Sequence, residues 1–500
     1  MRRRRAGKLC QFRAPKHPYR LTPLSITADL TAESERAAAR LVGTVAPLGS
    51  DSPADVASTP WRIAPRPFPL SPAAVAELER LGNDLLAFYV AANRLYASAV
   101  RGRAPAWVLT CLEQGKPERV RELGRLRRYR SALPVMIRPD LMALDGGGFM
   151  ATELDAVPGG FGVLGAISRA YHELGFRLVG GVDGIAQGLA AALRGAAKVD
   201  DPSVALVVAD ESEDYRPEMD WAAAALCEAG LPTRQIHPRD LRLHDDALQM
   251  RNCQGWEAVD LVYRFLELHD LPNIPKIDLV IYAMKHRLAT VTAPLKSYLE
   301  EKLLFYLFHH PELDSFWRGA LGRETQARLA RMLPPTWLLD PQPIPPTAAL
   351  DPPLMAGKRR IRQWTDLRGL SQRERRLVLK PSGFSELAWG SRGVTIGHDV
   401  NQDEWHQAVD LALASFETTP YILQQFHQSR RVGVSYYDVQ TDAVRPMTGR
   451  ARLSPYYMVV DGQARLCGVL VTVVPAANKV IHGTSESVMM PAMVSDEAEI

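Results

Sequence analysis

The sequence has few cysteines and no long apolar run. Its five cysteines are scattered over 500 residues without any C-x-x-C spacing, at Cys10, Cys111, Cys227, Cys253 and Cys467. This pattern argues against a disulfide framework or a cysteine zinc site, and it fits a reducing cytosol. No stretch of about eighteen apolar residues occurs, so we expect no membrane-spanning segment and no membrane partner. The sequence therefore indicates a cytoplasmic globular protein.

Acidic residues are absent from the start of the chain. Basic residues between Arg2 and Arg20 leave this segment strongly positive, whereas the whole chain carries a formal net charge of only +4. Such an arm can contact nucleic acid or anionic lipid, but a solvated tail is the commoner outcome. The segment lacks the apolar stretch of a secretory signal. No recognisable DNA- or RNA-binding module accompanies it, so we do not expect a nucleic-acid partner.

A glycine-rich dinucleotide fingerprint is also missing, although the chain contains a β-α-β pattern. Residues 203–209 form a continuous apolar run, which is typical of a buried parallel strand. A helical pattern at 218–229 and a strand pattern at 233–236 complete the unit. Because no G-x-G-x-x-G follows the first strand, we do not expect a dinucleotide site there. Further strands are predicted at 261–265 and 279–283.

The remaining patterns predict a mixed α/β chain of several structural units, as its length suggests. A helix is predicted to begin at Ser71, which can cap it, with proline in the first turn. Other helices are expected at 31–42, 117–131, 165–174 and 405–416, and strands predominate after residue 376. We divide the chain into four parts. They are an irregular basic extension at 1–70, a helical segment with a hairpin at 71–165, a β-α-β domain at 166–292, and strand-rich subdomains with a proline-rich linker at 293–500.

Charged residues gather in one predicted hairpin. Arg138 and Asp140 lie at the end of one strand pattern, and Glu153 and Asp155 lie in the next, after a turn at 145–148. Side chains two residues apart on a strand share a face, so the last two carboxylates point the same way. Carboxylate oxygens suit Mg²⁺ that also holds nucleotide phosphates, and an arginine can neutralise charge on a reacting group. The alternative is a solvated hairpin with charged ends.

A second group of polar residues follows later strands. Lys380 ends the strand pattern 377–380 and precedes a loop with glycines and serines, which can fold over phosphates. Gln424 and Gln425 lie in the short apolar strand 421–426, whose backbone and amides could meet the rim of an adenine. Each residue also has an ordinary explanation, because strand-end lysines and paired glutamines usually face water. Their order along the chain favours a nucleotide site.

These motifs together resemble the ATP-grasp ligases, specifically the circularly permuted branch that includes glutathionylspermidine synthetase. The resemblance runs from about residue 130 to 490. Its motifs are the Lys380 strand with its loop, the 421–426 strand, the segment 294–302, and the two pairs of charged residues in the hairpin. In ordinary ATP-grasp chains the metal carboxylates follow the two ATP lysines, whereas here they precede both. This is the order of the permuted branch.

The resemblance implies an ATP-grasp fold with a Rossmann-like domain before it, at 166–292, and a variable N-terminal region. It implies that Lys302 and Lys380 hold the ATP phosphates and that Arg138 stabilises the reacting acyl phosphate. The resemblance also implies a lid over the γ-phosphate that contains Ser391, Arg392 and Gly393. It implies adenine contacts from Gln424 and Gln425, and it implies Mg²⁺ ligands at Asp140, Glu153 and Asp155. The chain departs from the family by Asp155, where asparagine is usual, and by a lid with fewer glycines and Trp389.

The resemblance therefore implies an ATP- and Mg²⁺-dependent ligase that joins a carboxylate to an amine through an acyl phosphate. Its substrates would be small molecules or peptides, and the sequence is compatible with a homo-oligomer. A different class of function is a non-catalytic nucleotide-binding or scaffolding protein, which the altered lid suggests and the retained carboxylates oppose. Nucleic-acid binding through the basic arm is a third reading, which salt-dependent binding to a generic duplex would reveal.

Overall fold

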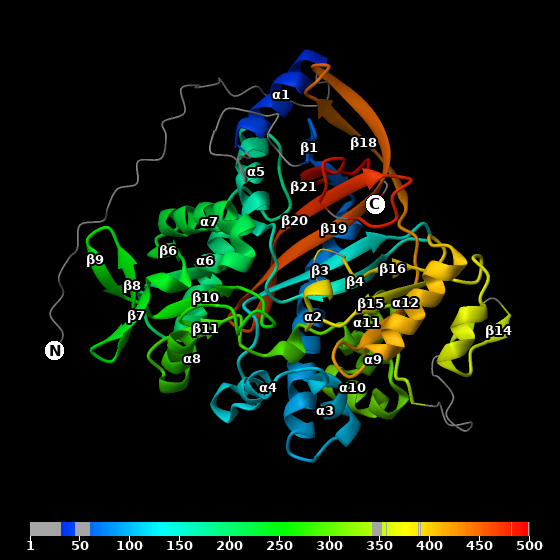
Figure 1. Ribbon diagram of the computed structural model, residues 1–500. Coiled ribbons are helices and arrows are strands. Elements are labelled where there is room, and N and C mark those ends of the chain that lie inside the picture. Colours follow the sequence, from blue (N-terminus) through cyan, green and yellow to red (C-terminus); the bar gives the residue numbers. More distant parts are fainter. Residues whose placement is uncertain are drawn as a thin grey trace.

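The computed structural model describes residues 32–45, 61–342, 353–356, 358–388, 390, 392–481, 483–498 and 500. A long central sheet lies between a smaller α/β lobe and a second lobe built from strands and helices (Figure 1). The basic arm and most of the proline-rich linker fall outside the described residues. Within the described part of the chain, no helix is both long and apolar enough to cross a membrane.

The central sheet has eight strands in the order β18-β1-β21-β20-β19-β3-β4, with β2 beside β21. Its strands are β1 (Arg62–Ile63), β2 (Phe68–Leu70), β3 (Met136–Ala143), β4 (Phe149–Asp155), β18 (Arg431–Asp438), β19 (Ala443–Val460), β20 (Gln463–Pro475) and β21 (Val488–Val494). The prediction that residues up to 70 are irregular is wrong for β1 and β2, which pair in parallel with β21. Their buried apolar side chains, such as Phe68 and Leu70, anchor them there.

The predicted hairpin is present and forms one edge of this sheet. Arg138 on β3 stands opposite Asp155 on β4, and Asp140 stands opposite Glu153, with a register shift after Asp140. Residues directly opposite each other on paired strands share a face. All four charged side chains therefore belong to the same side of the hairpin.

A parallel four-stranded sheet forms the smaller lobe, in the order β11-β10-β5-β6. Its strands are β5 (Val204–Val208), β6 (Thr233–Ile236), β10 (Leu261–Phe265) and β11 (Thr290–Thr292), and its helices are α6 (Gly184–Ala197), α7 (Arg216–Glu228) and α8 (Ile277–His286). The β-α-β prediction is confirmed, because α7 connects parallel β5 and β6. The predicted strand at 279–283 is wrong: it lies in α8, whose residues Ile277, Val280, Ile281 and Met284 are buried at helical spacing.

Three further sheets are present in the described residues, and the sequence predicted only part of them. A three-stranded antiparallel sheet joins β7 (Leu241–His244), β8 (Ala247–Asn252) and β9 (Gly255–Ala258), which the sequence reading did not predict. Strands expected after residue 376 form an antiparallel sheet with β12, which was not predicted, in the order β12-β17-β15-β16. Its members are β12 (Thr336–Leu338), β15 (Leu377–Pro381), β16 (Thr395–Ile396) and β17 (Tyr421–Gln425); a hairpin of β13 (Met355–Ala356) and β14 (Arg359–Arg360) precedes them.

Helices cover the sheets. They are α1 (Ala32–Val45), α2 (Pro72–Ala99), α3 (Ala106–Glu113), α4 (Glu118–Arg125), α5 (Phe161–Glu173), α9 (Leu303–His309), α10 (Asp314–Leu321), α11 (Arg323–Met332) and α12 (Gln402–Ala414). Ser71 caps α2 as predicted, since its Oγ accepts a hydrogen bond from the Ala74 N–H at 3.2 Å. The helix predicted at 117–131 is α4 followed by a 3₁₀ turn, Arg127–Tyr129.

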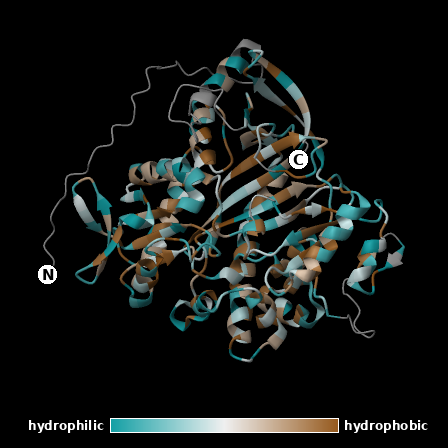
Figure 2. Ribbon diagram, in the orientation of Figure 1, coloured by the Kyte–Doolittle hydropathy of each residue, from teal (hydrophilic) through white to brown (hydrophobic). Residues whose placement is uncertain are grey.

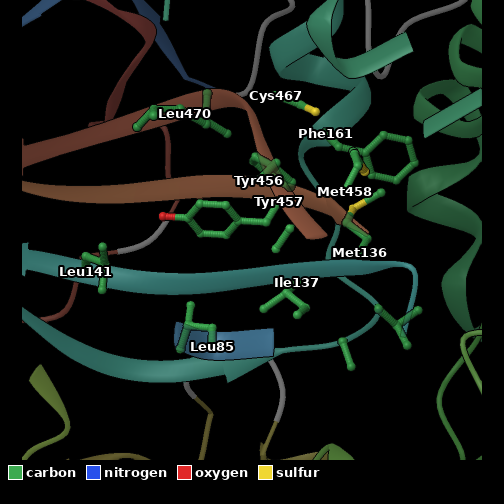
Figure 3. Packing of buried hydrophobic residues seen from close by; sticks show 14 of the residues in the cluster. Leu85, Met136, Ile137, Leu141, Phe161, Tyr456, Tyr457, Met458, Cys467 and Leu470 are labelled. Atoms are coloured by element: carbon green, nitrogen blue, oxygen red, sulfur yellow. The ribbon is translucent and has the colours of Figure 1, made fainter. Parts of the chain in front are cut away.

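The main core lies between the central sheet and α2. Hydrophobic residues line the inner strands and the helix faces turned towards them (Figure 2). Tyr457 on β19 is fully buried and its hydroxyl donates to the Leu78 carbonyl at 2.7 Å. Figure 3 shows Tyr457 near Ile137 of β3 and Leu85 of α2. This packing fixes the edge hairpin, because β3 pairs with β19 along the same layer.

Trp317 of α10 belongs to the same hydrophobic cluster and packs against α2, so it can be used to test the contribution of this cluster to stability. It is fully buried, stacks on Phe88 with ring centroids 5.3 Å apart, and donates from Nε1 to the Leu307 carbonyl at 2.8 Å. We expect Trp317→Ala to lower the free energy of unfolding by about 3–5 kcal/mol, because it leaves a cavity and an unpaired carbonyl. Urea unfolding measures the loss. Trp256→Ala, at a partly exposed site, is the control and should cost about 1 kcal/mol or less; equal losses would contradict the packing argument.

Candidate functional site

A cavity of about 670 Å³ opens between the edge hairpin, the β15–β17 sheet and the smaller lobe. Eight of the predicted site residues line it: Arg138, Asp140, Glu153, Asp155, Lys302, Lys380, Gln424 and Gln425. Gly390 and Val394 of the predicted lid loop also line it, whereas Arg392 and Gly393 do not. Ser391 and Trp389 fall outside the described residues. The structure thus brings most of the predicted residues into one space.

Lys380 enters the cavity from β15. Its Nζ donates to Gln424 Oε1 at 2.8 Å and to the Thr152 carbonyl at 2.9 Å. The two side chains meet because Gln424 stands opposite Val378, two residues before Lys380 on the same face. Burial, with a contribution from Lys302, lowers the pKa of Lys380 to about 8, although Glu153 opposes this. Lys380 is a cation held by neutral partners and available to an anion.

Lys302 approaches the same place from the start of α9. Its Nζ lies 3.4 Å from Glu153 Oε2 and donates to the Ala388 carbonyl at 3.2 Å. Burial opposes ionisation of Glu153, but Lys302, Arg138 and Lys380 outweigh it and lower the pKa of Glu153 to about 2. Glu153 is therefore an anion surrounded by cations.

Asp140 is fully buried between two arginines. Its Oδ1 lies 3.0 Å from Arg138 Nε and accepts a hydrogen bond from Ser454 at 2.9 Å, while its Oδ2 lies 3.1 Å from Arg452 Nη1. Arg138 also contacts Asp155, with Nη2 3.2 Å from Oδ2. The salt bridge between Arg138 and Asp140 is thus present, and it aims the guanidinium at the carboxylates of β4.

The three predicted metal ligands do not form a complete metal site. Among the described residues, no three His, Cys, Asp or Glu side chains are close enough to hold an ion by themselves. Asp140 faces the arginines, and Asp155 Oδ1 accepts from the Val157 N–H at 2.8 Å. Glu153 and Asp155 are each about a third exposed, at 34% and 33%. Mg²⁺ is commonly bound by one or two carboxylates together with phosphate oxygens, so this pair fits such a shared site.

The strand proposed to meet adenine differs from expectation in one respect. β17 is a central strand, and the N–H groups of Gln425 and Phe426 donate to the carbonyls of Pro335 and Arg376 at 3.0 Å. These backbone donors are therefore unavailable to a base. What remains is the exposed Gln425 side chain and an apolar lining from Val378, Ile396 and Phe426.

An acidic wall, which the sequence reading missed, faces the cavity from the smaller lobe and the 300 segment. It consists of Glu218, Glu267 and Glu300. Burial raises the pKa of these residues to about 7, 8 and 7, and it is opposed at Glu218 by the N–H groups of Gly160 and Gly162, and at Glu300 by Arg264. Glu267 follows the buried strand β10, and the carboxyl end of a parallel strand is a common place for site residues. The position of Glu267 just after the buried strand β10 is the sequence feature that could have revealed it.

The second missed group lies on β19. Arg452, Ser454 and Tyr456 alternate with Leu453 and Pro455 along the strand, and all three line the cavity. The Tyr456 hydroxyl donates to the Gly159 carbonyl at 2.7 Å. A period-two series of polar residues within a buried strand is the signal that could have revealed them.

Comparisons with known proteins identify the fold. No family model and no curated protein matches the chain. A glutathione synthetase like-effector from Globodera pallida, in its apo form, matches with a TM-score of 0.53 and 12% identity over 93% of this chain and 98% of that one. The chain therefore shares the fold of that protein. A putative gamma-glutamylcysteine synthetase from Methylobacillus flagellatus matches at a TM-score of 0.40 and 11% identity, over 83% and 86% of the chains, too weakly to support an inference.

The acidic wall predicts a pH dependence. Glu267 has a pKa raised to about 8 in the folded protein, so between its ordinary pKa and 8 the unfolded chain binds fewer protons and stability falls as pH rises. Glu267→Gln stays neutral, so its stability relative to the wild type should rise by roughly 4 kcal/mol from pH 5 to pH 8.5, because one pKa unit corresponds to about 1.4 kcal/mol. Calorimetry at both pH values measures this. Glu173→Gln, at an exposed site, should show no such change; a constant difference for Glu267→Gln would refute the raised pKa.

Proposed function

We propose that the protein is an ATP-dependent carboxylate–amine ligase that requires Mg²⁺ and releases ADP. The observation that carries this proposal is the meeting of Lys302 and Lys380, from distant parts of the chain, beside Glu153 in one large cavity. The shared fold with a glutathione synthetase like-effector supports it. The carboxylates at 140–155 precede both lysines, which supports a circularly permuted ATP-grasp arrangement with a Rossmann-like domain at 166–292.

In this proposal the triphosphate lies between Lys302 and Lys380. Both ammonium groups now donate to carbonyl oxygens, which phosphate oxygens would replace with stronger, charge-assisted bonds. The adenine would lie on the apolar lining near Gln425, with Gln424 holding Lys380 in place. Ser391, Arg392 and Gly393 belong to the loop that would close over the γ-phosphate.

Glu153 and Asp155 are the residues that would hold Mg²⁺. The ion, when bound, would neutralise negative charge on the phosphates. Asp140 takes a different part in the proposal, because its oxygens are occupied by Arg138 and Arg452. It would orient these two guanidinium groups rather than supply the principal metal ligand.

The reaction transfers a phosphoryl group and then an acyl group. The substrate carboxylate attacks the γ-phosphorus of ATP, ADP leaves, and an acyl phosphate forms. The amine attacks its carbonyl carbon and forms the C–N bond in a tetrahedral intermediate, which loses a proton from nitrogen and expels phosphate as the C–O bond breaks. Arg138 would stabilise the negative oxygen of that intermediate. The acidic wall would receive the amine, because carboxyl groups with pKa values near 7 to 8 can accept the proton that the amine loses as it reacts.

A second candidate is a non-catalytic nucleotide-binding or scaffolding protein. Its supporting observation is that both lysines already have internal acceptors and that Lys302 is tied to the lid carbonyl of Ala388. ADP release from Mg-ATP, measured with pools of carboxylates and amines, separates the candidates. Turnover that needs one compound from each pool supports the ligase. Nucleotide binding without ADP release from any pair supports the second candidate.

Mg-ATP should stabilise the folded protein. A ligand that binds only the folded state raises its stability by about 2.7 kcal/mol at a hundredfold excess over Kd. We expect a clear rise in Tm with millimolar Mg-ATP, and a loss of that rise in Lys302→Met and Lys380→Met. Lys285→Met, at an exposed site on α8, should behave like the wild type. A wild-type Tm that does not move would rule out the nucleotide assignment.

Arg138 should act on the chemical step. Arg138→Ala is expected to lower kcat by roughly 10²–10³, as for other lost oxyanion donors, while Mg-ATP affinity changes little. Because it leaves Asp140 and Asp155 with fewer cations, Tm should fall as well. Arg138→Lys keeps the charge, so it should recover Tm and only part of kcat. Measuring kcat, Kd and Tm on both variants separates a catalytic role from a structural one. If the loss of activity equals the loss of folded protein, Arg138 has a purely structural role.

A further inference from the structure

A buried ion pair contacts the segments that carry Lys302 and Lys380. Lys116, in the turn between α3 and α4, has its Nζ 2.5 Å from Glu301 Oε1, and both side chains are 2% exposed. Lys116 also donates to the Leu112 carbonyl. The other oxygen of Glu301 accepts hydrogen bonds from the Ser382 hydroxyl and from the Gly383 N–H, the latter at 3.1 Å.

This carboxylate joins the two segments that carry the cavity lysines. Glu301 immediately precedes Lys302, and Ser382 lies two residues after Lys380. The backbones also touch, since a Cβ on Gly383 would lie 1.9 Å from the Glu300 carbonyl oxygen. Consecutive Cα atoms are only about 3.8 Å apart, so a tie at these positions constrains where both lysines stand.

The turn that carries Lys116 itself packs against the loop between α12 and β17. A Cβ on Gly115, whose φ is +69°, would lie 2.0 Å from the Thr418 carbonyl oxygen. Gln114 donates to the Glu417 carbonyl at 3.2 Å, and the Ser382 N–H donates to the Pro420 carbonyl at 2.8 Å. Helices α3 and α4 therefore deliver a buried cation to a junction of segments that are far apart in the sequence.

We infer that Lys116 and Glu301 are positioning residues: they set the separation of Lys302 and Lys380 and so the affinity for the triphosphate of Mg-ATP. This inference rests on the proposed function. It assigns a task to the helical segment before the hairpin, which no motif had explained. Two ions are expensive to bury, and an apolar pair of similar size often stabilises a fold equally well. Because Glu301 also accepts hydrogen bonds from Ser382 and Gly383, we expect the Lys116–Glu301 pair to fix the position of the segment after Lys380 as well as to affect stability.

The test separates geometry from stability. Lys116→Met with Glu301→Leu removes both charges and both ties without leaving an unpaired ion. Asp84→Leu with Arg328→Met is the matched control, because it removes a two-pronged ion pair, with contacts of 2.7 Å, between α2 and α11 away from the cavity. Calorimetric titration gives Kd for Mg-ATP and for adenosine, which has no phosphates, and thermal melting gives Tm.

We expect the Lys116/Glu301 variant to weaken Mg-ATP binding on the order of ten- to a hundredfold, as loss of outer supporting groups does at metal sites. Adenosine binding should change no more than about twofold, and the control variant should keep its Kd for Mg-ATP whatever its Tm. An unchanged Kd for Mg-ATP in the Lys116/Glu301 variant would overturn the inference, as would an equal loss for adenosine.

Two further measurements keep the outcome decisive. If the double variant does not fold, Ser382→Ala removes only the hydroxyl tie and should still weaken Mg-ATP binding several-fold; wild-type affinity there would overturn the inference. If the wild type itself binds no Mg-ATP, the proposed function fails and the inference falls with it. Wild-type binding with unaffected variants makes only the inference fail.

Discussion

The site depends on charge compensation around one fully buried carboxylate. Asp140 lies between Arg138 and Arg452, which come from paired strands of the central sheet. Without these cations its burial would be very costly, and without Asp140 the two guanidinium groups would repel each other. The arrangement also fixes the direction of Arg138 towards Asp155 and Glu153. The edge of the sheet thus becomes a rigid array of alternating charge.

The cavity lining holds its carboxyl groups in two opposite electrical surroundings. Lysines and arginines surround Glu153 and lower its pKa to about 2. At Glu218, Glu267 and Glu300 burial outweighs the nearby cations, so the surroundings favour the neutral forms. Glu153 comes from the hairpin of the central sheet, whereas Glu218 and Glu267 come from the smaller lobe, so neither part of the fold contains the site alone.

The sequence predicted those elements that depend on interactions between residues close together in the chain. The hairpin, β5, β6, β10 and the Lys380 strand were predictable because alternation, apolar runs and turn residues act over a few positions. The strand expected at 279–283 failed because an apolar run fits a buried helix as well as a strand. β1 and β2 are short and are stabilised by pairing with β21, more than four hundred residues away. The acidic wall, likewise, exists only once α7, the end of β10 and the 300 segment come together.

This distant pairing has a consequence for how the chain acquires its structure. β21, at Val488–Val494, supplies the partner for both β1 and β2 and also pairs with β20. During synthesis the segment at 62–70 therefore lacks its β21 partner until almost all of the described chain has left the ribosome, and the other partner of β1, β18, also lies more than 350 residues further along the chain. Contacts of such long sequence separation slow folding and leave apolar edges exposed in the meantime. Nascent chains of this protein are accordingly expected to need chaperone protection until the last strand arrives.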